Sequence, residues 1–181
     1  KHSFGLKIYN NFLPKDGFAY KLTPLFSTGT KDITGEINLS FTRYSQTNKF
    51  KSIKFSVDSR RYLYDYEKEY TRIMPSVDIT LQKKSLRSKI DNYLSASYVH
   101  LIKENETLKF ITSRYTYSNA RTFNPYSIHA TIEKGDNYNK MHLRMNLRKD
   151  INKKKKLNVR AYLGYVNTTS NTYDLKMSSW N

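Results

Sequence analysis

The chain has no cysteine among its 181 residues. This absence excludes a disulfide framework and a thiolate metal site, and it leaves the cellular compartment open. Apolar residues are scarce at 38%, with a mean hydropathy of -0.76, which is low for a domain that must fill a core of this size. No apolar run approaches the roughly 20 residues that a membrane-spanning helix needs. The start at Lys1-His2-Ser3 does not resemble a signal peptide, so we expect any targeting segment to lie outside this chain.

Acidic residues are few, with 15 Asp and Glu against 32 Lys and Arg, and the formal net charge is +17. A surface this basic attracts nucleic acid, anionic lipid headgroups or acidic glycans. A lysine-rich proteome would explain the same charge, because charge alone does not identify a partner. Aromatic residues, in contrast, reach 14%, including 16 Tyr and 9 Phe, and this content indicates a folded chain.

Catalytic motifs are missing as well. The histidines His2, His100, His129 and His142 include no pair four residues apart beside a glutamate, which a zinc-peptidase helix requires. No nucleophile elbow, phosphate-binding loop or glycine-rich dinucleotide turn occurs either. His129 and His142 share the polar side of two expected neighbouring strands, but a structural zinc site normally needs four ligands. We therefore expect no catalytic residue, metal ligand or cofactor in this chain.

Alternation of apolar and polar residues is the main positive signal, and it is most regular from Tyr126 to Val166. Side chains of a β-strand point alternately to opposite faces, so this segment predicts three strands with one apolar and one polar face. Leu, Met and Ala are weak strand formers, so the alternation carries the prediction. The same pattern predicts further strands near residues 4–9, 18–27, 32–43, 50–59, 72–81, 91–101 and 107–117, and the start of one more at 172–177.

Three positions modify this pattern. The segment 60–70 is rich in tyrosine and charge, and it is either a loop or an extension of the flanking strands. Pro75 interrupts a ladder of hydrogen bonds, so we expect it near a strand end or bulge. Gly35 falls on the apolar side of its strand, where it leaves a gap or allows a bend.

Together these segments predict an all-β, antiparallel up-and-down fold of about ten strands or more, each of about ten residues, without an amphipathic helix. We expect a single domain over residues 1–181, as part of a longer chain. Such a meander fits either a soluble sandwich or barrel with its apolar side inward, or a transmembrane β-barrel with its apolar side outward.

Three features favour the transmembrane β-barrel. The polar side mixes small hydroxyl and amide residues with isolated charges, which suits a wet lumen where acids and bases of neighbouring strands pair. Ten residues suit a tilted membrane crossing, and the apolar sides carry no charge in their central parts. Tyrosines gather near strand ends, as in an interfacial girdle, although cross-strand packing explains the same pattern; they are Tyr62, Tyr64, Tyr66, Tyr70, Tyr115, Tyr117, Tyr126 and Tyr138.

The alternation assigns residues to each side of the expected barrel. The residues predicted to face lipid are Ile33, Ile37, Leu39, Phe41, Ile53, Phe55, Val57, Val77, Ile79, Ile128, Ile132, Met141, Leu143, Met145, Leu147, Val159 and Leu163. The residues predicted to face the lumen are Glu36, Asn38, Lys54, Asp58, Asp78, His129, Glu133, Lys140, His142, Arg144 and Arg160. A basic stripe in the lumen, which would favour anionic solutes, consists of Arg144, Arg148 and Arg160 beside Lys140. Pairing with Glu36, Asp58, Asp78 and Glu133 is the simpler use of these bases.

Several phrases, in order and spacing over roughly the whole chain, resemble a known arrangement; they are residues 4–11, 13–15, 20–31, 35–37 and 72–77. They are similar to the carboxy-terminal outer-membrane β-barrel region of the M1-type (gluzincin, aminopeptidase N-like) metallopeptidases of Bacteroidetes. The resemblance implies a zinc-peptidase domain, with its zinc, in a part of the protein that this chain lacks. It also implies the bacterial outer membrane as the location.

The leading functional hypothesis is therefore a membrane anchor or scaffold of a larger protein or complex, in contact with outer-membrane lipid and with other outer-membrane proteins. A soluble basic β-domain that binds nucleic acid or acidic glycan is the alternative, and a solute channel is a further one. We do not expect nucleic acid as the partner. The run Lys153 to Lys156 is a solvated turn or a contact for phosphate groups.

Overall fold

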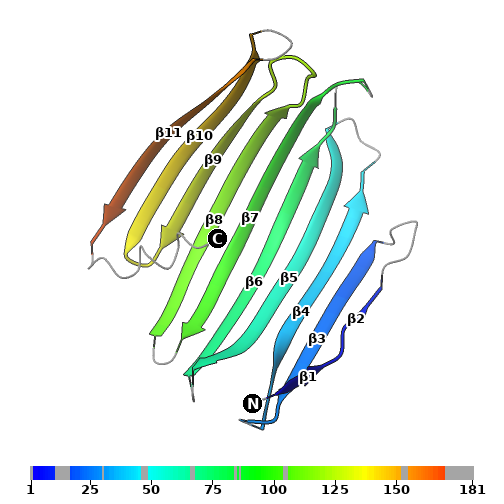
Figure 1. Ribbon diagram of the computed structural model, residues 1–181, viewed down its shortest axis with the longest axis vertical. Coiled ribbons are helices and arrows are strands. Elements are labelled where there is room, and N and C mark those ends of the chain that lie inside the picture. The colour runs from blue at the N-terminus through cyan, green and yellow to red at the C-terminus, as the bar shows by residue number, and fades with distance from the viewer. Residues whose placement is uncertain are drawn as a thin grey trace. The chain divides into compact units, whose positions relative to one another are not determined.

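The structure is a computed structural model that describes residues 2–10, 17–29, 31–45, 49–65, 68–83, 85, 87–103, 106–151 and 155–169, with the side chains of residues 64 and 65 left out. The described residues form β-strands and connecting segments and contain no helix (Figure 1). The strands are β1 (Ser3–Gly5), β2 (Ile8–Tyr9), β3 (Phe18–Ser27), β4 (Asp32–Tyr44), β5 (Phe50–Asp65), β6 (Lys68–Leu81), β7 (Ile90–Lys103), β8 (Glu106–Asn119), β9 (Tyr126–Gly135), β10 (Tyr138–Asp150) and β11 (Lys156–Thr168). The strand expected at 172–177 lies outside the described residues.

The sheet contains 11 strands in the order β1-β3-β4-β5-β6-β7-β8-β9-β10-β11, with β2 paired to β3. From β3 onward each strand neighbours the next one in the sequence, which is an up-and-down arrangement (Figure 1). The all-β antiparallel fold and the expected strand number are thus confirmed. Within the described residues no pairing joins β1 to β11, so the sheet is not closed.

The long strands exceed the expected length. β4 has 13 residues, β5 has 16 and β6 has 14, because the segment 60–70 extends both β5 and β6. Soluble strands are commonly about five or six residues long. Pro75 is not near a strand end: it lies in the middle of β6, because this strand begins at Lys68 and not at Arg72, where the alternation first becomes regular.

The register keeps apolar residues opposite apolar residues. In the pairing of β10 with β11, Leu143 lies opposite Leu163 and Met145 lies opposite Ala161. In the pairing of β3 with β4, Tyr20 lies opposite Leu39. Because the side-chain period of a strand is two, this register places the predicted apolar residues of neighbouring strands on one common side.

Gly35 is required by the backbone of β4. It lies opposite Pro24 and has a φ of 137°, a conformation that residues with a side chain rarely adopt. A Cβ atom at this position would lie 2.1 Å from the carbonyl oxygen of Thr23. Of the two expectations for this glycine, the structure favours the bend.

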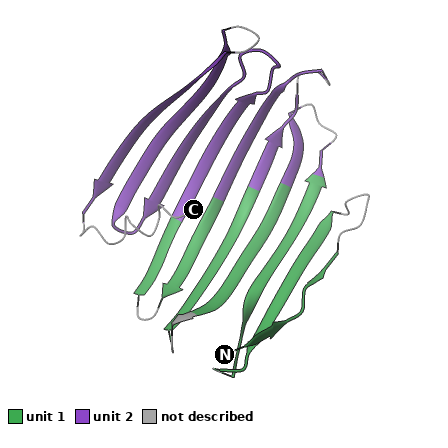
Figure 2. Ribbon diagram, viewed as in Figure 1, with its two compact units in different colours: residues 1–43, 54–77, 97–110 green, residues 44–53, 78–96, 111–181 purple. Residues whose placement is uncertain are grey.

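The described strands divide into two compact units (Figure 2). Unit 1 contains residues 1–43, 54–77 and 97–110, and unit 2 contains residues 44–53, 78–96 and 111–181. The strands β4 to β8 contribute residues to both, and each unit is described by itself below.

Most of the buried side chains lie on the polar side of the strands; Asn119, which shares the parity of Tyr117 on β8, is an exception. Among the described residues, the buried polar side chains are Ser40, Asp58, Asn119, Thr131 and Glu133. The buried apolar and aromatic side chains are few: Val99, Leu101, Phe110 and Tyr138. Val99 and Leu101 share the parity of Tyr93 on β7, and Phe110 shares that of Arg114 on β8, so even these lie on the side that carries the polar residues. This distribution is the reverse of that in a soluble sheet, which buries its apolar side.

Candidate functional site

We call the residues that the alternation predicted to face lipid the apolar face. Most of their side chains are exposed. Leu163 is 71% exposed and its cross-strand partner Leu143 is 42% exposed. The other exposed members are Ile33, Ile37, Leu39, Phe41, Phe55, Val57, Ile132, Met141, Met145, Leu147 and Val159. Ile53, Val77, Ile79 and Ile128 are half-buried. Each unit therefore exposes apolar side chains along its strands.

The residues predicted to face the lumen form the polar face, and most of them are less exposed. Asp58 is 9% exposed and Glu133 is 7% exposed. The half-buried members are Glu36, Asn38, Lys54, Asp78, His129, Lys140 and His142. Arg144 and Arg160 are exposed, and Arg160 belongs to β11, whose residues are all exposed.

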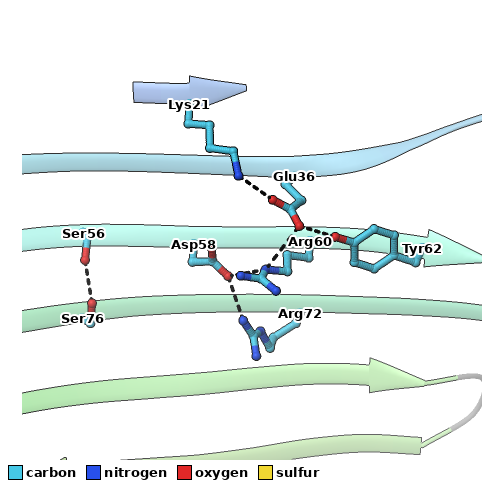
Figure 3. A network of polar contacts seen from close by, with 8 residues as sticks. All are labelled: Lys21, Glu36, Ser56, Asp58, Arg60, Tyr62, Arg72 and Ser76. Atoms are coloured by element: carbon cyan, nitrogen blue, oxygen red, sulfur yellow. Dashed lines mark hydrogen bonds and ion pairs between the residues drawn. The ribbon is translucent and has the colours of Figure 1, made fainter. Parts of the chain in front are cut away.

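In unit 1 the polar face is an ion-pair network (Figure 3). Asp58 accepts hydrogen bonds from Arg60 Nε at 3.1 Å and from Arg72 Nη2 at 2.9 Å. Glu36 accepts hydrogen bonds from Lys21 Nζ at 3.1 Å and from the hydroxyl of Tyr62. Each carboxylate thus has at least two donors.

The alternation of β5 explains this network. Residues 56, 58, 60 and 62 point to the same side of the strand because they are two residues apart. Lys21 lies opposite Asn38 in the register, and its side chain reaches the diagonal neighbour Glu36. Beside them, the hydroxyl groups of Ser56 on β5 and Ser76 on β6 lie 2.7 Å apart.

In unit 2 the polar face contains a hollow of about 580 Å³. It is lined by Tyr93, Thr112, Arg114, Thr116, His129, Thr131, Glu133, Lys140, His142, Arg144 and Tyr162. His129 lies directly opposite Arg144 in the register, and its Nδ1 is 3.2 Å from the hydroxyl of Thr116. The ring of His142 stacks on that of Tyr162 with centroids 5.9 Å apart. The lining side chains come from strands β7 to β11.

Two acids on the polar face of unit 2, Glu133 and Asp78, are engaged by tyrosines. Glu133 accepts a hydrogen bond of 2.7 Å from the hydroxyl of Tyr138, and Asp78 accepts one from the hydroxyl of Tyr93. In the described part of the chain, no acid lies within ion-pair distance of Arg114, Arg144 or Arg160. The cations that line this hollow therefore outnumber its acid.

The predicted pairing of the basic stripe with Glu36, Asp58, Asp78 and Glu133 is wrong for Arg144 and Arg160. Glu36 and Asp58 pair with cations of their own unit, and the other two acids bind tyrosine hydroxyls. Arg160 Nε donates instead to the side-chain oxygen of Asn146 at 3.2 Å, and Arg148 Nε lies 3.6 Å from Asp150. A second hollow, of about 930 Å³, is lined by Arg144, Arg148 and Arg160 among other residues.

Tyr117 and Tyr126, on the apolar parity, stack with ring centroids 5.8 Å apart, which fits the cross-strand packing that was the alternative to an interfacial girdle. Tyr62 and Tyr138 instead lie on the polar face, because their hydroxyls donate to buried or half-buried carboxylates, so the girdle prediction is wrong for them. The side chain of Tyr64 and all of Tyr66 lie outside the described residues, as do residues 152–154 of the lysine run.

Histidines do not gather into a metal site in the part of the chain that is described. No group of three or more His, Asp or Glu side chains there is arranged to hold a metal ion. His129 and His142 are diagonal neighbours on β9 and β10, since His142 lies opposite Thr131 and His129 lies opposite Arg144. The residues present do not fit the four-ligand zinc site that such a pair would need.

Several polar-face residues were missed by the sequence analysis: Lys21, Arg60, Tyr62, Arg72, Tyr93, Arg114, Tyr138 and Tyr162. For Arg60 and Tyr62 the signal was present, because they continue the parity of Asp58. For the others, the pattern alone did not indicate which neighbouring strand each side chain meets.

Comparison with models of known protein families, with curated proteins and with solved structures finds no match to this chain. The described residues also include no helix that is long and apolar enough to cross a membrane.

Proposed function

We propose that the chain is a region of a transmembrane β-barrel in a bacterial outer membrane, where it acts as an anchor or scaffold for a larger protein or complex. The observation that carries this proposal is the reversed burial: apolar side chains are exposed along long strands, and the carboxylates Asp58 and Glu133 are buried on the polar face. Water disfavours so many exposed apolar side chains, whereas lipid solvates them at no cost. The closed barrel is part of the proposal.

Strand length supports the same proposal. A tilted membrane strand needs about 9–11 residues, and β4 to β8 have 13 to 16. The unit 1 network supports it further, because charged side chains of a membrane-spanning region face the protein interior or a water-filled cavity and pair with one another. Lys21, Arg60 and Arg72 pair in this way with Glu36 and Asp58.

A finer proposal follows from the resemblance of the turns and strand starts to the barrel region of Bacteroidetes M1-type metallopeptidases. In this view a zinc metallopeptidase-like domain stands elsewhere in the full-length protein and the barrel holds it at the membrane. The complete coding sequence tests this: a helix with two histidines four residues apart beside a glutamate supports it, and an upstream region without any zinc-ligand set contradicts it.

The membrane proposal has a direct test, since the chain has no cysteine and single cysteines can be introduced freely. Leu143→Cys and Leu163→Cys carry a fluorophore on the apolar face, and Arg144→Cys carries it on the polar face. In vesicles, we expect lipid-borne quenchers to quench the first two labels strongly and the third weakly. Equal quenching at all three positions would contradict the orientation.

The competing function is a soluble basic domain that binds polyanions, and the net charge of +17 favours it. Phase partitioning separates the two. The membrane proposal predicts that the full chain enters the detergent phase. A chain that stays in water without detergent and binds heparin or single-stranded nucleic acid with a steep salt dependence would overturn it.

A further inference from the structure

The polar faces of the two units differ in their balance of acidic and basic side chains. In unit 1, Asp58 has Arg60 and Arg72 within 3.1 Å, and Glu36 has Lys21 at 3.1 Å. Figure 3 shows that both acids of this network are paired, with the three cations Lys21, Arg60 and Arg72 against two carboxylates. The network has an excess of only one positive charge, so its attraction for an anion from solution is weak.

In unit 2 the balance is positive. The 580 Å³ hollow is lined by the cations Arg114, Lys140 and Arg144 and by one acid, Glu133. Tyr138 holds that carboxylate at 2.7 Å, on a side chain that is only 7% exposed. Arg114 and Arg144 are exposed, so their guanidinium groups are accessible to a solute.

The rest of the lining suits an oxygen-rich anion. It offers hydroxyl groups from Tyr162 and three threonines, together with the rings of His129 and His142, while the hydroxyl of Tyr93 is engaged by Asp78. Guanidinium groups bind carboxylate and phosphate oxygens through two parallel hydrogen bonds, and hydroxyl groups supply further donors. The volume lies within the range of about 300–1,000 Å³ that is typical of small-molecule sites.

We propose that the polar face of unit 2 binds a small dianionic oxyanion of the phosphate type, with Arg114 and Arg144 as its principal ligands. Lys140 adds positive charge from the same side of β10 as Arg144, since the two are four residues apart on one strand. An extended nucleic acid fits less well, because the hollow is local and contains a buried carboxylate. The inference does not depend on lipid behind the apolar face.

The test is equilibrium binding of inorganic phosphate to the full chain at low ionic strength, in detergent micelles or in water, whichever keeps it dispersed. We expect saturable binding that chloride displaces poorly. Arg144→Gln and Arg114→Gln should each weaken it about tenfold, because each removes a charged hydrogen-bond donor. Arg87→Gln is the matched control: it makes the same change at an exposed arginine of unit 2 that does not line the hollow, and it should leave binding unchanged.

Several results would overturn the inference. They are a lack of saturable phosphate binding, an equal loss in the Arg87→Gln control, or tight binding of single-stranded nucleic acid with none of phosphate. If Arg144→Gln alters the strand signal in circular dichroism, Arg114→Gln and Arg144→Lys carry the test, and Arg144→Lys should retain part of the affinity. A phosphate-bearing short-chain lipid in a parallel titration separates headgroup from free phosphate, and we expect free phosphate to compete with it fully. If the chain binds phosphate but partitions into water, the membrane proposal is contradicted and the phosphate-binding proposal is supported.

Discussion

A single charge placed in the middle of the apolar face gives the sharpest test of the proposed membrane environment. Leu163 is suited to it, because it lies near the middle of β11 and opposite Leu143, which lies near the middle of β10. Leu163 is 71% exposed, so replacing it with arginine displaces little protein packing. What surrounds the side chain then decides the effect of Leu163→Arg on the free energy of unfolding.

The two environments predict different magnitudes. At the midplane of a membrane, an arginine on the outer face of a barrel destabilises it by about 2–4 kcal/mol. At an exposed position in water, a substitution usually changes the free energy of unfolding by within about 0.5 kcal/mol. The membrane proposal further predicts a gradient with depth: Leu157→Arg, on the same face but at the start of β11, should cost only about 0–1 kcal/mol.

The assay is a denaturant titration of the full chain reconstituted in lipid vesicles, which yields the free energy of unfolding for each variant. Tyr162→Arg is the matched control, since Tyr162 is the adjacent residue and lies on the polar face. It should cost about 1 kcal/mol through the lost stacking on His142, whose ring centroid is 5.9 Å away. If Leu163→Arg costs no more than Leu157→Arg and Tyr162→Arg, lipid does not surround the apolar face.

Other predictions concern the strands themselves and use the same titration. Gly35→Ala should destabilise the chain by at least about 1 kcal/mol, because the φ of Gly35 is 137° and the new Cβ would meet a backbone oxygen. Gly164→Ala is the control and should cost less, because its new Cβ would meet only a tyrosine side chain. Equal losses in the two variants would contradict the bend at Gly35. Asp58→Asn should lower the free energy of unfolding by about 2 kcal/mol, because it leaves two arginines without their carboxylate. Asp91→Asn is the control and should lower it by under about 1 kcal/mol, because the pair of Asp91 with a lysine is exposed. The reverse order would refute the role of the network. Tyr138→Phe should cost about 1–2 kcal/mol, since it removes the hydroxyl that holds a buried carboxylate, and an unchanged midpoint would show that this bond is dispensable.

The faces of the strands could be predicted from the sequence because parity is a local property. Once Leu143 and Leu163 are assigned to one side, every second residue follows, and the observed register keeps these two opposite each other. The meander could be predicted too, because short polar connections leave neighbouring segments few other ways to pair.

The partners of the charges could not be predicted in the same way. Whether Glu133 meets Tyr138 or Arg144 depends on the register between strands and on the direction of long side chains, which the pattern of one strand does not contain. Pro75 illustrates a second limit, since the alternation around Arg72 marked where the pattern became regular and not where β6 begins. Propensity and pattern locate the centre of a strand better than its ends.

The up-and-down order also affects how the chain acquires its fold. Since each strand from β3 onward pairs with the next segment of the chain, the contacts that form the sheet are close in sequence, and such contacts close quickly. A slip of one residue between β10 and β11 would turn Arg144 toward the side of Leu163 and would mismatch every pair along both strands. The side chains of each hairpin therefore disfavour a slipped register between its two strands, before the next strand pairs with them.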